Sequence, residues 1–288
     1  MFDVVIIVDW SAAVAPKRGA DSIWSYELGD GRTDLINHPT RAEARAHLST
    51  RLLQLAGRRV LVGFDFAFAY PAGFAAAASL TAPGVPAWRA VWQHVAGQIS
   101  DDDRNRNNRW SVAAELNERL GSRHFWGAPP ASAGPHLTST KPASFALAEY
   151  RRSEAHLREV TGKRPFSAWQ LLGAGAVGSQ TLMGIPTLHH LRHHEGLAER
   201  TRVWPFETGF TTDPWAARPD GIVLAEVWPS AVEFGHVTHP VKDARQVIAL
   251  AQRLRTSADD GSLAVAFSPP SRPADEAAAL EEGWVLTP

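Results

Sequence analysis

The chain of 288 residues is 44% hydrophobic and 20% charged, a composition typical of a globular protein with a sizeable core. Its 29 Lys and Arg residues nearly balance 30 Asp and Glu residues, so a nucleic-acid partner would have to be bound by local basic patches. The absence of cysteine excludes disulfides and thiolate chemistry. No apolar run approaches the ~20 residues that span a bilayer, and the first residues show no secretory signal. We therefore expect a cytoplasmic protein with no membrane partner.

Apolar runs and turn signals predict the element order β-β-β-α-β at the start of the chain. The β-branched run over residues 4–8 is typical of a strand that is buried on both faces. Residues 19–39 predict two strands around the turn at 29–31. Thr40 is expected to cap a helix that ends near Gly57, and residues 58–71 predict another buried strand.

The remaining chain is predicted to be mostly helical, with one further strand. Residues 220–231 favour a third buried strand, and residues 241–257 favour a helix in which Asp243 shares the apolar face. We interpret 1–288 as a single domain with a largely helical insertion at approximately 72–217. Helices are expected within this insertion at 87–99, 110–120, 143–160 and 167–193.

Each of the three expected central strands carries one acid near its carboxyl end: Asp9, Asp65 and Glu226. Ligands of open α/β sheets bind beyond these strand ends, and Asp243 begins a helix that we expect to pack against the same edge. Successive side chains of a strand alternate between its two faces, so each acid shares a face with the residue two positions before it. These neighbours are Ile7, Gly63 and Leu224.

Four carboxylates in one place repel each other strongly, and a divalent cation would neutralise them. Oxygen ligands suit Mg²⁺ or Mn²⁺, and a pair of such ions can activate water and stabilise the leaving oxygen in phosphodiester cleavage. The sequence therefore predicts that Asp9, Asp65, Glu226 and Asp243 are both the catalytic residues and the metal ligands.

The order β-β-β-α-β-insertion-β-α, with Asp9 ending the first strand, resembles the ribonuclease H-like fold of ribonuclease H, Holliday-junction resolvases and integrases. More closely, five segments resemble motifs of a bacterial family, domain of unknown function 429, which is predicted to consist of ribonuclease H-like nucleases: "VDWSA", "FDFAFAYPAG", "LMGIP", "EVWPSA" and "VKDARQV". The resemblance implies that Asp9, Asp65, Glu226 and Asp243 correspond to that family's site acids. Trp10 stands where relatives often have glycine.

Cations near the first acid and in the insertion are candidates for contacts with phosphate. Ser11, Lys17 and Arg18 follow Asp9 and are the expected substrate-binding residues. A second group lies in the insertion, and ordinary solvated surface charge is the alternative interpretation for all of these cations. Its members are Arg151, Arg152, Arg158, Lys163 and Arg164.

Two other motifs do not fit the functions that they suggest. "GAGAVG", residues 173–178, matches the dinucleotide-binding pattern, but the residues before it favour a helix where that motif requires a strand. We interpret it as a surface of small residues that allows close backbone approach. "HHLRHH", residues 189–194, has histidines at helical spacing but no acidic or cysteine companion, so we interpret it as an exposed helix end.

The sequence thus predicts an α/β protein with a ribonuclease H-like mixed sheet flanked by helices, acting as a nuclease or phosphodiesterase that depends on Mg²⁺ or Mn²⁺. Two alternatives remain open. One is a Mg-nucleotide-binding protein of the actin-like or sugar-kinase type, although the residues after the first strand match a glycine-rich phosphate hairpin poorly. The other is a non-enzymatic binding protein on the same fold.

Overall fold

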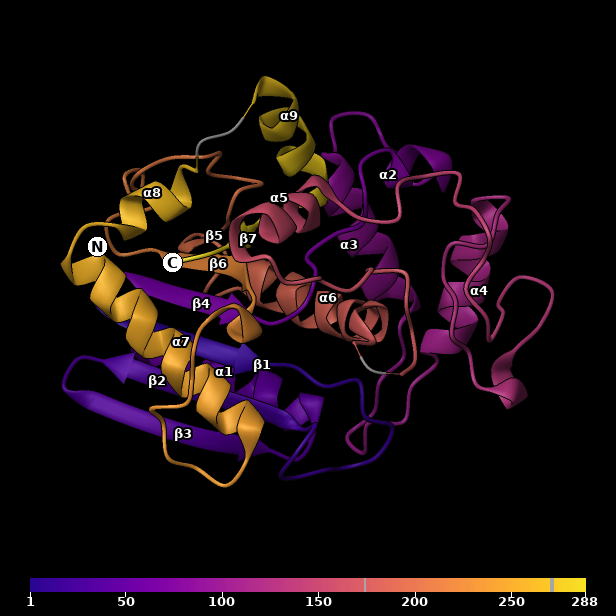
Figure 1. The fold of residues 1–288 in the computed structure, drawn as a ribbon. Coiled ribbons are helices and arrows are strands. Elements are labelled where there is room, and N and C mark those ends of the chain that lie inside the picture. Colours follow the sequence, from indigo (N-terminus) through magenta and orange to yellow (C-terminus); the bar gives the residue numbers. More distant parts are fainter. Residues whose placement is uncertain (174, 270–271) are drawn as a thin grey trace.

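A mixed β-sheet forms the centre of the protein (Figure 1). The computed structural model describes residues 1–173, 175–269 and 272–288. Within these residues the sheet has seven strands in the order β3-β2-β1-β4-β6-β5, and β7 also pairs with β6. The strands are β1 (Val4–Asp9), β2 (Ile23–Gly29), β3 (Arg32–His38), β4 (Val60–Phe64), β5 (Thr201–Val203), β6 (Ile222–Val227) and β7 (Val285–Leu286).

The first three strands form an antiparallel meander, and the central strands β1, β4 and β6 run parallel to one another. The predicted order β-β-β-α-β is confirmed, as is the third buried strand. The register aligns Ile7 with Gly63, and Gly63 with Ala225. One residue further along, Val8 lies beside Phe64, which in turn lies beside Glu226.

Helices cover both faces of the sheet (Figure 1). On one face α7 packs across β1 and β2, where its Val247 and Leu250 share a core cluster with Val5 and Ile7. On the other face α1, α3 and α6 enclose a second cluster that includes Ile6. The helices are α1 (Arg41–Gln54), α2 (Phe74–Ala77), α3 (Ala87–Gln98), α4 (Arg109–Arg119), α5 (Arg152–Thr161), α6 (Val177–His193), α7 (Lys242–Asp259), α8 (Leu263–Phe267) and α9 (Pro273–Glu282).

The expected insertion is only partly separate from the sheet. The helices predicted at 87–99 and 110–120 are confirmed as α3 and α4. The helices predicted at 143–160 and 167–193 begin later than expected, at Arg152 and Val177. Before α6, Gly173 and Gly175 have φ angles of 94° and 72°, which a right-handed helix excludes. Strand β5 lies near the end of the 72–217 segment, so that part of the segment belongs to the sheet.

Helix α6 approaches the segment after β4 closely at Gly184. A Cβ atom at this position would lie 2.3–2.5 Å from ring carbons of Phe66. The Phe66 ring is buried and packs against Trp10, Phe64 and Phe68, so it has little room to move. Glycine therefore allows α6 to lie against the residues that directly follow Asp65. No helix among the described residues has the length and apolar character needed to cross a membrane.

We predict that Gly184→Ala lowers the free energy of unfolding by about 1–2 kcal/mol, because overpacking outweighs the higher helix propensity of alanine. Gly97→Ala in α3 is the matched control, since a Cβ there has no heavy atom within 4 Å. It should raise the free energy of unfolding by about 0.5 kcal/mol. Urea unfolding of both variants measures the difference, and equal effects would contradict the proposed packing.

Candidate functional site

The sheet register places the predicted acids on different faces. Asp9 follows Ile7 on the face that α7 covers, and Asp65 follows Gly63, whose Cβ position lies 2.8 Å from Ile7 Cδ1 on the same face. Glu226 instead follows Leu224, which packs in the cluster on the opposite face. The backbone N–H of Asp65 donates to Val8 O at 3.0 Å, which continues the pairing between β4 and β1. Asp9 and Asp65 therefore end adjacent strands side by side.

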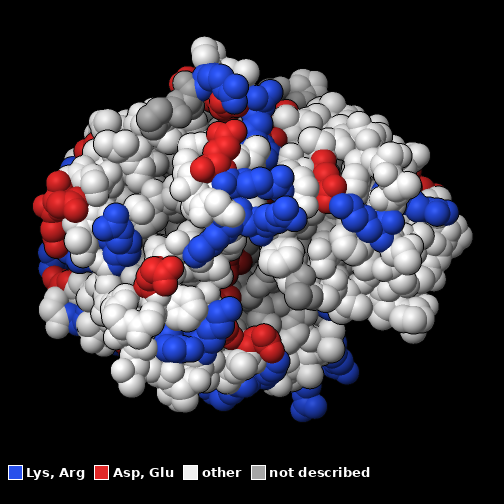
Figure 2. All heavy atoms as spheres, viewed as in Figure 1, with Lys and Arg blue, Asp and Glu red and all other residues white. Residues whose placement is uncertain are grey.

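Three of the four predicted acids, Asp9, Asp65 and Asp243, line one open cleft of about 540 Å³, and Glu226 does not. Asp243 lies in the first turn of α7, where its Oδ2 accepts a hydrogen bond from the backbone N–H of Asp21 at 2.7 Å. Figure 2 shows a hollow on this side of the molecule with atoms of acidic residues inside it. The other lining residues are Trp10, Ser11, Ala12, Asp21, Ser22, Gly173, Gly175, Ala176, Gln180 and Gln246.

The carboxylates of Asp9 and Asp65 have no hydrogen-bond or ion-pair partner within the described ranges of the chain. Burial raises the pKa of Asp9 well above its usual value, and the charges of Asp65, Asp243 and Asp21 raise it further. Burial, followed by the charges of Glu226 and Asp243, raises the pKa of Asp65 to about 7. Both carboxylates thus lie in a place that disfavours their negative charge, and a bound cation would relieve this cost.

Glu226 has a cationic partner of its own. Arg151 donates from Nη1 to Glu226 Oε2 at 2.8 Å and from Nη2 to Oε1 at 2.5 Å, and the same guanidinium binds Glu154. The backbone N–H of Phe68 donates to Glu226 Oε2 at 3.0 Å. Burial raises the pKa of Glu226 although Arg151 opposes this. The sequence grouped Glu226 with the other acids, whereas the structure places its carboxylate in a buried ion pair behind the cleft.

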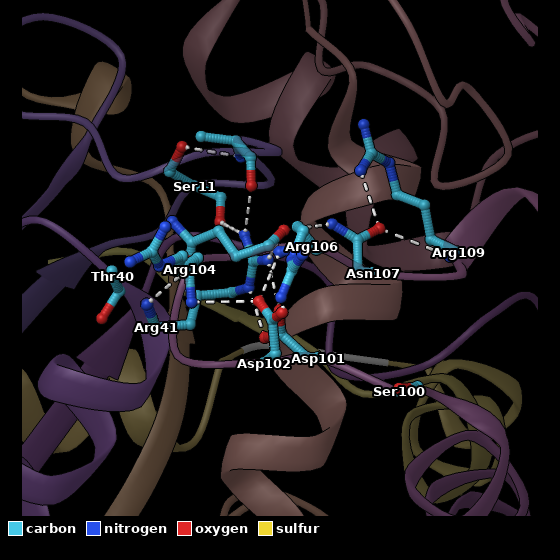
Figure 3. A network of polar contacts seen from close by, with 12 residues as sticks. Ser11, Thr40, Arg41, Ser100, Asp101, Asp102, Arg104, Arg106, Asn107 and Arg109 are labelled. Atoms are coloured by element: carbon cyan, nitrogen blue, oxygen red, sulfur yellow. Dashed lines mark hydrogen bonds and ion pairs between the residues drawn. The ribbon is translucent and has the colours of Figure 1, made fainter.

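The loop between β1 and β2 forms one wall of the cleft and is held by Arg41, at the start of α1 (Figure 3). The Arg41 side chain is 2% exposed and binds both carboxylate oxygens of Asp101 at 2.6 Å. Its Nη1 also donates to the carbonyl oxygens of Ser11 at 3.1 Å and Ala13 at 2.8 Å. These bonds fix the chain immediately after Asp9 to the segment between α3 and α4.

Of the three expected substrate-binding residues, only Ser11 lines the cleft. Its Oγ donates to Asp21 O at 3.1 Å and accepts from the backbone N–H of Ala13. Lys17 pairs with the Asp21 carboxylate at 3.3 Å, and Arg18 donates to the carbonyl oxygen of Asn37. Lys17 thus binds a residue of the β1–β2 loop, and Arg18 binds a residue of β3. Neither cation lines the cleft.

Among the cleft residues that the sequence predictions did not include are Asp21, Gln180 and Gln246. Gln246 lies one helical turn from Asp243, so its spacing was a usable signal. Gln180 carries no such signal and reaches the cleft because its Nε2 donates to Trp10 O at 2.7 Å. The Trp10 side chain is 1% exposed and packs against Phe64 and Phe66, so its bulk lies in the core.

The glycine-rich motif supports close packing, as expected. A Cβ at Gly178 would lie 2.5 Å from Ala168 O, and one at Gly175 would lie 2.2 Å from the Phe166 ring. Residue 174 of the motif lies outside the described residues. The histidines at 189–194 occupy the end of α6, where the His189 and His193 rings are 4.3 Å apart.

Comparison of the chain with protein-family models, curated proteins and solved structures finds no match in any of the three. The described residues contain no group of three or more His, Cys, Asp and Glu side chains arranged to hold a metal ion. The function has to be inferred from the acids of the cleft and from what surrounds them.

The raised pKa of Asp65 predicts a dependence of stability on pH in metal-free protein. Because the folded-state pKa is about 7 and the ordinary value is 3.8, the folded state binds the proton more tightly than the unfolded state. The free energy of unfolding should therefore fall as the pH rises from 4 to 7, and Asp9, whose pKa burial also raises, should add to this fall. Asp65→Asn should make the fall less steep and be more stable than the unchanged protein at pH 8, by on the order of 2 kcal/mol.

Urea unfolding in EDTA between pH 4 and pH 8 measures this dependence. The matched control is Asp103→Asn, since Asp103 is exposed and lies outside the cleft. An Asp65→Asn profile that is as steep as that of the control would contradict the assignment.

Proposed function

We propose that the cleft binds Mg²⁺ or Mn²⁺ at Asp9 and Asp65 and hydrolyses phosphoester bonds, as a nuclease or phosphodiesterase does. The observation that carries the proposal is the pair of carboxylates that end adjacent parallel strands, open to one cleft, with no partner among the described residues. Mg²⁺ is commonly bound by one or two carboxylates together with substrate phosphate and water, so two acids suffice.

Asp243 supports the same site from α7. Its Oδ2 is held by the backbone N–H of Asp21, and its charge raises the pKa of both Asp9 and Asp65. A carboxylate in this position can accept a proton from a water molecule or orient it for attack on phosphorus. A bound divalent cation would supply the charge that stabilises the developing negative charge on the phosphoryl oxygens.

We include the ribonuclease H-like fold and the domain of unknown function 429 family in this proposal. The antiparallel meander β1–β3 is followed by β4 and β6 parallel to β1, and α7 follows β6, in the element order of that fold. The acid at the end of β1 and the acid after β4 support a site at the same edge of the sheet. Arg151 already donates hydrogen bonds to both carboxylate oxygens of Glu226, so we assign Glu226 no direct contact with the divalent cation.

The test of the metal site is Asp9→Asn. Mn²⁺ binding is measured by electron paramagnetic resonance, and cleavage is measured with bis(p-nitrophenyl) phosphate and with single-stranded oligonucleotides. We expect the variant to lose at least tenfold in Mn²⁺ affinity and at least a hundredfold in cleavage rate while its circular dichroism spectrum stays unchanged.

Asp103→Asn, which removes an exposed acid elsewhere, should retain both properties and serves as the control. Metal-dependent cleavage by Asp9→Asn at the rate of the control would refute the assignment. Failure of the unchanged protein to bind Mn²⁺ would favour a non-enzymatic binding protein.

Asp243 and Glu226 are expected to respond differently, because one is open to the cleft and the other is paired with Arg151. We predict that Asp243→Asn weakens Mn²⁺ binding several-fold with little loss of stability. Glu226→Gln should change Mn²⁺ affinity less than twofold but lower the free energy of unfolding by about 3 kcal/mol, because it removes one partner of a buried ion pair. Calorimetric titration and urea unfolding of both variants give the comparison, and the reverse ranking would contradict it.

A further inference from the structure

A second, smaller recess adjoins the acidic cleft. It has a volume of about 170 Å³ and lies between α5, the end of β6 and the start of α6. Asp65, Gly175 and Gln180 line both the recess and the cleft, so the two spaces are neighbours across these residues. A group bound in the recess would therefore lie beside a phosphoester held at Asp65.

Apolar and aromatic side chains form the walls of the recess. Phe166 is 47% exposed, which is unusual for a phenylalanine, and its ring lies over Gly175, where any Cβ would collide with it. Trp228, Leu157 and Pro165 complete the walls. An exposed aromatic ring beside a small recess is suited to stacking against a flat ring of a ligand.

The recess also has charged lining residues, whose hydrogen-bonding groups already bind one another. Arg151, Glu154 and Glu226 line it, and their charged groups bind one another. The indole N–H of Trp228 has no hydrogen-bond partner in the parts of the chain that the structure describes, and it remains a donor for a ligand. These features favour a flat, uncharged ring with polar edges over a charged or purely aliphatic group.

Cations flank the recess. Arg158 and Arg164 directly adjoin the lining residues Leu157 and Pro165 in sequence, and neither they nor Lys163 form an ion pair among the residues described. The Arg158 guanidinium lies over the Tyr150 ring, 5.2 Å from its centroid. Lys163 Nζ donates to the carbonyl oxygen of Ser230, another lining residue, at 2.6 Å. Figure 2 shows Lys and Arg atoms gathered over α5 beside the hollow. Positive charge near the recess would attract the phosphate of a nucleotide.

We propose that the recess binds the nucleobase next to the phosphoester held at the acidic cleft, so that the substrate is a nucleotide or an unpaired nucleic-acid strand. The inference rests on the proposed function for the position of the phosphoester. The recess accommodates one ring system and requires it to be unstacked from its neighbours, which a base inside a duplex is not. Phe166 supplies the stacking surface, and the Trp228 indole supplies a donor to the base edge.

The test is calorimetric titration with adenosine 5′-monophosphate and with ribose 5-phosphate, which lacks the base, in Mn²⁺ and again in EDTA. We expect the nucleotide to bind at least tenfold more tightly than ribose 5-phosphate. Phe166→Ala should reduce nucleotide affinity about tenfold and leave ribose 5-phosphate unaffected, because only the base stacks on the ring. Leu280→Ala is the control, since Leu280 is 49% exposed and outside the recess. It should change neither affinity.

Equal affinities for the two ligands, or equal effects of Phe166→Ala and Leu280→Ala, would overturn the nucleobase recess. The two proposals fail separately. Nucleotide binding that depends on Phe166 in EDTA, in a protein that binds no Mn²⁺, supports the recess and contradicts the metal site. Mn²⁺-dependent cleavage that is unchanged by Phe166→Ala, with no preference for the nucleotide over ribose 5-phosphate, supports the metal site and overturns the recess.

Discussion

The register of the parallel strands β1, β4 and β6 determines which acids meet in this protein. Ile7, Gly63 and Ala225 are aligned, so Asp9 and Asp65 come one step later on the same face. Glu226 is aligned with Phe64 and therefore points to the opposite face. A shift of one residue in the pairing of β6 would exchange these faces. The hydrophobic cores on both sides of the sheet prevent such a shift, since Leu224 and Ala225 are each buried on their own side.

The two faces deal with negative charge in different ways. Glu226 is enclosed, and an enclosed carboxylate is costly unless it is paired, so Arg151 neutralises it and in doing so ties α5 to the sheet. The same guanidinium donates to the carbonyl oxygen of Glu282 and thereby holds the end of α9. At Asp9 and Asp65 no side chain of the described residues forms such an ion pair, although the charge of Lys242 acts to lower the pKa of Asp9. The fold thus supplies a counter-charge where structure requires one and leaves the open pair of acids available to a ligand.

The sequence was sufficient for five of the seven strands of the described sheet and for three of the four predicted acids, which do meet in one cleft, because buried strands and strand-end acids have local patterns. The short strands β5 and β7 were not predicted. Alternation correctly paired Glu226 with Leu224, but a single strand does not reveal which face of the sheet its residues occupy. That requires the register against β4, which depends on contacts between distant segments. The sequence also gave no sign that Arg151 is buried. It is one of the five candidate cations of the insertion, and the other four are not buried. The late start of α6 follows from the left-handed backbone at Gly173 and Gly175, which an apolar periodicity does not detect.

Gly175 lines both the cleft and the recess, and it lies two residues before the first residue of α6. Its positive φ ends the preceding loop, and its missing side chain leaves space for the Phe166 ring. The recess is therefore bounded on one side by an aromatic ring and on the other by the ion-paired side chains of Arg151, Glu154 and Glu226, while the adjoining cleft retains acids without a cationic partner. A ligand that spans both would place an uncharged ring against charged groups that already bind one another, and its phosphate where a cation can bind. This change from paired to unpaired charge along one continuous surface is the physical basis for treating the two spaces as parts of one site.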